Sequence, residues 1–101
     1  MKILLVEDDP GIIHSLTEFL TGEGFSITSV PGQQEAVNAY RSARFDLALI
    51  DISLENGDGY AVCRAIKADR DIPVIFLTAS GDEASVVTGL DLGADDYIAK
   101  P

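Results

Sequence analysis

Short apolar runs recur along the chain and predict the strands of a buried sheet. Continuous apolar segments occupy residues 3–6, 47–50 and 74–77, and each is rich in Ile, Leu and Val. Runs of this length, bounded by polar or turn residues, are typical of parallel strands buried on both faces. Weaker patterns at residues 25–30 and 97–99 add two more. The sequence therefore predicts five strands.

The first helix is predicted directly after the first strand. Asp9 is a suitable N-cap, and Pro10 suits the first helical position because its missing N–H has no partner there. Gly22 and Gly24 are placed to end the helix. The apolar residues that recur at helical spacing, and that we expect to face the sheet, are Ile12, Ile13, Leu16, Phe19 and Leu20.

Three further helices are predicted between the remaining strands. Their ranges are roughly 33–42, 59–68 and 83–90, with Asp58 as the cap of the second of these and Gly93 breaking the last. The residues expected to be buried are Ala36, Val37, Tyr40, Tyr60, Cys63, Ile66, Val86, Val87 and Leu90.

Alternating strands and helices predict an α/β fold with a doubly wound, five-stranded parallel sheet, because right-handed crossovers place helices on both faces. In such folds the functional crevice lies beyond the carboxyl ends of the strands. Five polar residues fall at that edge: Glu7, Asp8, Asp51, Thr78 and Lys100.

The acidic residues at this edge predict a cation site. Carboxylates packed closely raise one another's pKa and cost stability, so a bound cation is the expected compensation. Ligands that are all oxygen favour magnesium or calcium over zinc. The edge therefore indicates metal-assisted handling of phosphate.

Composition limits the number of domains, the kinds of binding partner and the cellular location that we expect. The chain has 101 residues and a formal net charge of -10, which suits one domain and opposes binding of this segment to nucleic acid or anionic membranes. Cys63 is the sole cysteine, so no internal disulfide forms. No basic segment followed by a long apolar run opens the chain, and a cytoplasmic location is expected.

The ordered set of motifs resembles the response-regulator receiver domains of two-component signalling, over essentially the whole chain. The residues that carry the resemblance are Val6-Glu7-Asp8-Asp9, Asp51, Asp58-Gly59, Leu77-Thr78-Ala79, Gly93-Ala94-Asp95-Asp96-Tyr97 and Lys100-Pro101. The Gly89-Leu90 and Gly93 to Tyr97 stretch is similar to the OmpR/PhoB-like subfamily. The resemblance implies a flavodoxin-like (CheY-like) sheet of strand order 2-1-3-4-5.

The resemblance also implies a phosphorylation site. Asp51 would be the nucleophile that takes a phosphoryl group from a sensor histidine kinase. Mg²⁺ would be bound by Asp8 directly, by Glu7 through water, by Asp51, and by the backbone carbonyl of Ser53. Taken singly, Asp51 also fits a solvated carboxylate at a strand end, and Asp8 a turn residue.

Lys100, Thr78 and Tyr97 would complete the receiver mechanism. Lys100 would aim its ammonium at the phosphoryl oxygens through a cis peptide bond to Pro101, although most lysines are simply surface residues. Thr78 and Tyr97 would form a switch, in which the Thr78 hydroxyl binds the phosphoryl group and the Tyr97 ring fills the vacated space beside the small Ala79. Each of the two also fits an ordinary structural role.

The chain departs from the family pattern in three places. Glu55 stands where a proline is usual, and we expect a looser loop there. Val86 stands where the subfamily usually has an arginine of its homodimer interface, so that homodimer is expected to be altered. A receiver normally continues past Lys-Pro into a fifth helix, and the expected arrangement is a receiver domain at residues 1–101 without that helix or an output domain.

Three functions fit these motifs. The first is a receiver that controls transcription through a DNA-binding domain outside this chain, and the second is a stand-alone receiver or phosphorelay adaptor. The third is an Mg²⁺-dependent phosphatase that uses an aspartyl phosphate. Such enzymes generally have a second aspartate two residues after the nucleophile, where this chain has Ser53, so a regulator rather than an enzyme is predicted.

Overall fold

The computed structural model describes residues 1–69, 71–78 and 93–100. The described elements are β1 (Lys2–Val6), α1 (Pro10–Gly22), β2 (Ser26–Val30), α2 (Gln33–Ser42), β3 (Leu47–Asp51), α3 (Gly59–Asp69), β4 (Val74–Thr78) and β5 (Asp96–Ala99). The helix predicted at residues 83–90, Ala79 and the Lys100-Pro101 bond lie outside the described residues.

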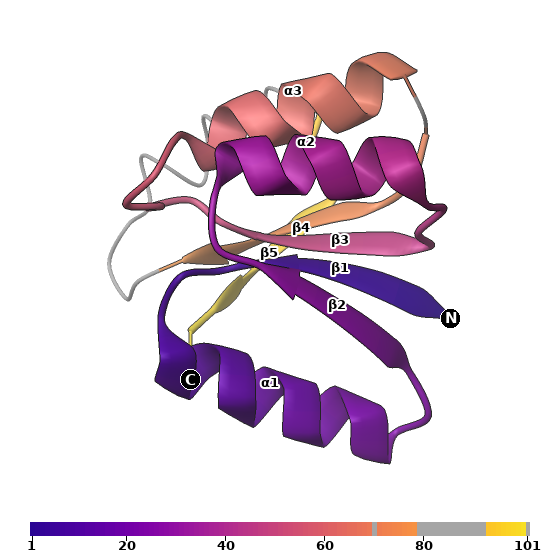
Figure 1. Cartoon of the computed structure of the whole chain (residues 1–101), viewed down its shortest axis with the longest axis vertical. Helices are drawn as coiled ribbons and strands as arrows, with labels where there is room; N and C mark the ends of the chain where they lie inside the picture. The colour runs from indigo at the N-terminus through magenta and orange to yellow at the C-terminus, as the bar shows by residue number, and fades with distance from the viewer. Residues whose placement is uncertain (70, 79–92, 101) are drawn as a thin grey trace.

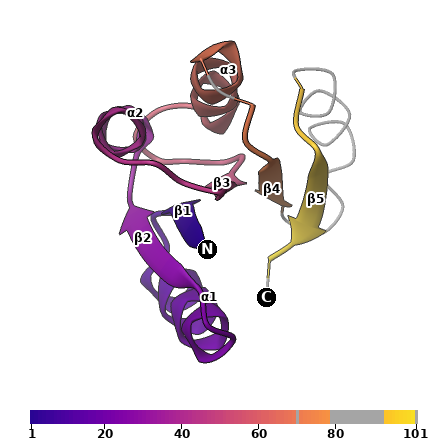
Figure 2. The same cartoon turned by 90° about the vertical axis from the view of Figure 1, so that its right-hand side faces the viewer.

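The five strands form one parallel sheet in the order β2-β1-β3-β4-β5, as predicted. Figures 1 and 2 show α1 on one side of this sheet and α2 with α3 on the other. The doubly wound architecture is therefore confirmed. The register pairs Val6 with Ile50 and Asp51 with Leu77, which brings the ends of β1, β3 and β4 to a common edge.

Alternation along the central strands divides the core between the two faces. Leu4, Val6, Ala48 and Ile50 pack with residues of α2 and α3, whereas the intervening positions pack with residues of α1. The residues on the α1 side are Ile3, Leu5, Leu49 and Leu77, all buried. Burial on both faces explains why these strands are continuous apolar runs in the sequence.

The first helix begins and ends as its sequence predicts. The Asp9 carboxylate accepts hydrogen bonds from the backbone N–H groups of Gly11 (2.8 Å) and Ile12 (3.2 Å), so Asp9 caps α1. The chain leaves the helix after Gly22, and Gly24 has a φ of 96°, a left-handed conformation that favours glycine.

Some predictions about the core are wrong. The Phe19 side chain is 64% exposed, because Ile13, Leu16 and Leu20 already form the stripe of α1 that packs on the sheet. Tyr60 is only half-buried, and Val62, which the sequence prediction left out, is fully buried in α3. None of the helices in residues 1–69, 71–78 and 93–100 is long and apolar enough to span a membrane.

Candidate phosphorylation and metal site

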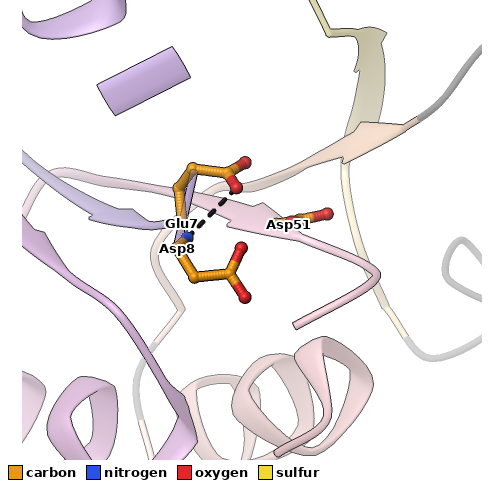
Figure 3. Close-up of side chains that lie close together, drawn as sticks. All are labelled: Glu7, Asp8 and Asp51. Carbon is orange, nitrogen blue, oxygen red and sulfur yellow. Dashed lines mark hydrogen bonds between the residues drawn. The ribbon is translucent and has the colours of Figure 1, made fainter. Parts of the chain in front are cut away.

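Three carboxylates converge where β1 and β3 end. Glu7 and Asp8 follow β1 directly, and Asp51 is the last residue of the neighbouring β3. One oxygen from each of the three lies within 4.8 Å of the others, and Figure 3 shows the three side chains close together. The convergence predicted from the strand ends is confirmed.

Glu7 is fully buried and incompletely paired. Its Oε1 accepts hydrogen bonds from the backbone N–H groups of Asp8 and Asp9, both at 3.1 Å, while Oε2 has no hydrogen-bond partner among the described residues. Burial, together with the nearby Asp51 carboxylate, raises the pKa of Glu7 to about 7, although the Asp9 amide and the Lys100 ammonium work against that rise.

Asp51 is held between the chain that follows it and a lysine. Its side chain is 1% exposed; Oδ1 accepts a hydrogen bond from the Ser53 N–H at 2.9 Å, and Oδ2 lies 3.0 Å from Lys100 Nζ. The same ammonium lies 3.9 Å from Glu7 Oε2. Partial burial lowers the pKa of Lys100, but the close Asp51 carboxylate, with the charges of Glu7 and Asp8, outweighs it and raises that pKa overall.

Asp8 is oriented by the loop that follows β3. Its Oδ2 accepts a hydrogen bond from the backbone N–H of Glu55 at 2.7 Å. Asp9, in contrast, is exposed and turned to the start of α1. The interpretation of Asp9 as a helix cap outside the metal set therefore agrees with its contacts.

The donor set fits a hard divalent cation. Three carboxylates share a space in which Lys100 supplies the ammonium, and a buried Glu7 oxygen has no hydrogen-bond partner among residues 1–69, 71–78 and 93–100. Carboxylate oxygens are ligands of Mg²⁺ and Ca²⁺, and a cation would offset both the mutual repulsion and the desolvation. The residues present are therefore compatible with the magnesium that the sequence predicts.

Comparison with known proteins identifies this arrangement. A family model described as the response regulator receiver domain matches residues 3–101. The chain belongs to that family. Receiver domains of response regulators act in phosphorylation-dependent signalling.

Three relatives show the range of proteins that contain such domains. DNA-binding response regulator MtrA of Mycolicibacterium smegmatis is 44% identical over 100 residues, which are 99% of this chain and 44% of that protein's length. The chain thus spans less than half of the relative. The BeF3-activated N-terminal receiver domain of RstA from Klebsiella pneumoniae is 30% identical, with a TM-score of 0.93. The match covers 99% of this chain and 86% of that one.

The third relative holds a metal ion. The receiver domain of sensor histidine kinase PA1611 from Pseudomonas aeruginosa PAO1 is 36% identical with a TM-score of 0.89, covering 99% of this chain and 84% of that one. Its crystal structure has a magnesium ion coordinated in the active site cleft. In this chain, the carboxylates of Glu7, Asp8 and Asp51 lie together.

Thr78 and Tyr97 differ in their relation to the receiver site. Thr78 ends β4 and is 5% exposed; its hydroxyl lies 3.5 Å from the Ile98 carbonyl oxygen, which is a long hydrogen bond, and its own carbonyl accepts the Lys100 N–H at 2.8 Å. Tyr97 pairs with Phe76 in the sheet register, and its side chain is 47% exposed. Thr78 is thus buried at the end of β4, whereas Tyr97 is about half exposed.

His14, the one histidine in the sequence, is exposed, and its Nε2 lies 3.2 Å from Glu18 Oε2 on α1. It is not a member of the acidic cluster. The contact from the Glu55 N–H to Asp8 was missed by sequence reasoning, because it is made by the backbone and does not depend on the side chain. The available signal for this contact was that Glu55, which has a backbone N–H, stands where the resemblance leads us to expect proline.

Proposed function

We propose that this receiver domain accepts a phosphoryl group on Asp51 from a sensor histidine kinase, with Mg²⁺ bound by Glu7, Asp8, Asp51 and the Ser53 carbonyl. The observation that carries the proposal is the buried Asp51 carboxylate, whose Oδ2 lies 3.0 Å from Lys100 Nζ and whose oxygens share a space with two further carboxylates. The low exposure restricts access of water to the reacting group.

The protein groups divide the work of phosphoryl transfer. An Asp51 oxygen forms a bond to phosphorus as the bond from phosphorus to the kinase imidazole nitrogen breaks, which makes an acyl phosphate. Lys100 is placed to stabilise the negative charge on the phosphoryl oxygens. A bound Mg²⁺ supplies further neutralisation of charge between nucleophile and phosphoryl group.

Phosphorylation is proposed to change the domain through Thr78 and Tyr97. The Thr78 hydroxyl has only a long hydrogen bond to Ile98, so it can be recruited by a phosphoryl oxygen at little cost. Movement of Thr78 would leave room for the exposed Tyr97 ring to turn inward. Phosphorylation would thereby favour the one of two states that offers the phosphoryl group all of its partners.

The proposed output is control of transcription through a DNA-binding domain outside residues 1–101, in the cytoplasm. The similarity to DNA-binding response regulator MtrA supports this output, and the net charge of -10 argues against DNA contact by the receiver itself. A phosphorelay or kinase-attached role is the second candidate, because the receiver domain of sensor histidine kinase PA1611 is also similar. We propose a regulator rather than an enzyme with an external substrate.

Incubation with acetyl phosphate and Mg²⁺, followed by intact-mass measurement, tests the proposal. Wild-type protein should gain the mass of one phosphoryl group, and both Asp51→Ala and an excess of EDTA should abolish the gain. A wild-type protein that folds but gains no mass would overturn the proposal. Turnover of a small phosphate ester would instead favour the phosphatase, and we expect none.

A further inference from the structure

The loop between β3 and α3 is tied to two other parts of the chain. Glu55 donates its backbone N–H to Asp8 Oδ2 at 2.7 Å, across from the end of β1. Its neighbours bind the start of α2: the Gln33 N–H donates to the Asn56 carbonyl at 3.0 Å, and the Asp58 N–H donates to Gln33 Oε1 at 2.9 Å. The loop is therefore held at Glu55 and at two residues that follow it, Asn56 and Asp58.

Gly57 allows the loop to approach α2 this closely. Its φ is 114°, in the left-handed region, and a Cβ added at Gly57 would lie 2.3 Å from the Gln33 Cβ. Any side chain at this position would both strain the backbone and push Gln33 away. The Gln33 contact thus depends on a glycine and fixes the position of the segment that carries the Glu55 amide.

We propose that the backbone amide of Glu55 is a positioning group for the metal site, which orients Asp8 for Mg²⁺. The inference rests on the proposed magnesium site. A carboxylate has two oxygens, and an N–H bound to one holds the group in place while the other remains available to a cation. Partners of this kind, outside the ligand shell, contribute to metal affinity by reducing the disorder that binding must remove.

The proposal concerns this chain in particular, because only a residue with a backbone N–H can make the contact. Proline, which receivers of this type usually carry at the position, has no N–H and cannot orient Asp8 in this way. Here the loop is held by the hydrogen bond to Asp8 and by the Gln33 contacts. Glu55 acts through Asp8 and is not expected to touch the phosphoryl group.

A pair of variants at the same position isolates the amide. Glu55→Ala removes the carboxylate and keeps the N–H, whereas Glu55→Pro removes both, so their comparison cancels any effect of the lost charge. We expect Glu55→Pro to bind Mg²⁺ about three- to tenfold more weakly than Glu55→Ala, the range that corresponds to loss of one typical intramolecular hydrogen bond. The measurement is an NMR chemical-shift titration with MgCl₂, with the thermal unfolding midpoint of each variant recorded alongside.

A second measurement needs no metal. In EDTA, hydrogen exchange of the Glu55 amide should be faster in Asp8→Ala than in wild type, because its acceptor is gone. The Ser53 amide, which donates to Asp51 Oδ1, serves as the internal reference and should not change. Should Glu55→Pro fail to fold, Gln33→Ala replaces it: loss of the acceptor for Asp58 should speed exchange at Glu55 and weaken Mg²⁺ binding.

The outcomes separate this inference from the proposed function. Equal Mg²⁺ affinity in Glu55→Pro and Glu55→Ala, in a protein whose wild type is phosphorylated, overturns the inference and leaves the proposed function standing. Unchanged exchange of the Glu55 amide in Asp8→Ala also overturns it. A wild type that neither binds Mg²⁺ nor gains a phosphoryl group overturns both.

Discussion

Lys100 Nζ lies 3.0 Å from Asp51 Oδ2, although Asp51 ends β3, Lys100 follows β5, and β4 lies between these strands. The contact depends on the parallel register, which brings the ends of β3, β4 and β5 to one edge. It places the one ammonium of the described site against its buried aspartate.

Loss of the Lys100 ammonium should slow phosphorylation. In Lys100→Ala, we expect the rate with acetyl phosphate and Mg²⁺ to fall on the order of tenfold or more, since preorganised charge at a phosphoryl group commonly contributes that much. Lys100→Arg is the matched control, because it keeps the charge and should retain more of the rate. Intact-mass time courses measure both, and an unchanged rate in Lys100→Ala would contradict the assigned role.

Neutralising Glu7 should stabilise the metal-free domain at alkaline pH. The pKa of Glu7 rises from 4.5 to about 7 on folding, so the folded state binds more protons, and stability falls as pH rises between those values. In EDTA at pH 8, Glu7→Gln should exceed wild type in unfolding free energy by about 3 kcal/mol at most. Urea unfolding at pH 4 should show no such gain, and a gain of equal size at both pH values would refute the electrostatic explanation.

Magnesium should stabilise the domain through Asp8. With Mg²⁺ at ten times its dissociation constant, linkage predicts a gain in unfolding free energy of about 1.4 kcal/mol, which EDTA should remove. Asp8→Asn should lose most of this gain. Asp9→Asn is the control, since asparagine still caps α1 and Asp9 lies outside the metal set. Thermal melts with and without Mg²⁺ test the pair, and equal gains in both variants would exclude Asp8 as a ligand.

A second ion pair, remote from the site, should stabilise the sheet. Asp95 Oδ2 lies 2.8 Å from Lys67 Nζ and accepts the Val74 N–H at 2.8 Å. The hydrogen bond from Lys67 comes first among the causes that lower the pKa of Asp95. The stability it contributes is therefore present above the unfolded pKa and lost as pH falls through the lower folded value.

Variants of this pair give a direct test. Asp95→Asn should lower the unfolding free energy by about 1 kcal/mol at pH 7, the usual size for loss of a partly exposed charged hydrogen bond. Asp71→Asn is the control, because Asp71 is fully exposed and 3.7 Å from the same lysine. Urea unfolding measures the loss of unfolding free energy in each variant. Equal losses would show that the Asp95 contacts contribute no more stability than the exposed Asp71.

Thr78→Ala should separate phosphorylation from switching. The variant keeps Asp51 and Lys100, so the mass gain with acetyl phosphate should persist. The Tyr97 side chain, 47% exposed in this structure, should become less accessible on phosphorylation in wild type and stay accessible in Thr78→Ala. Quenching of tyrosine fluorescence cannot resolve Tyr97 alone, so the NMR signals of its ring are the appropriate measure. Burial of Tyr97 in both proteins would count against the switch.

Much of the fold could be predicted because its signals are local. Continuous apolar runs identify strands buried on both faces, and the Asp9-Pro10 pair locates the start of α1. Which apolar residues of a helix are buried depends on packing between distant segments, and the local pattern did not predict this everywhere. Phe19 continues the helical spacing of α1 but is exposed, because α1 lies over the sheet with Ile13, Leu16 and Leu20 facing it.

By itself, the sequence determined the strand ends, the identity of the acidic residues and the order of motifs that marks a receiver domain, since these follow from residue type and spacing. Only the tertiary structure decided which of those groups touch. Register brings Lys100 to Asp51, burial raises the pKa of Glu7, and a loop closed by Gln33 presents the Glu55 amide to Asp8. Distances between side chains and the direction of a backbone N–H depend on how distant segments pack, and no local pattern encodes them.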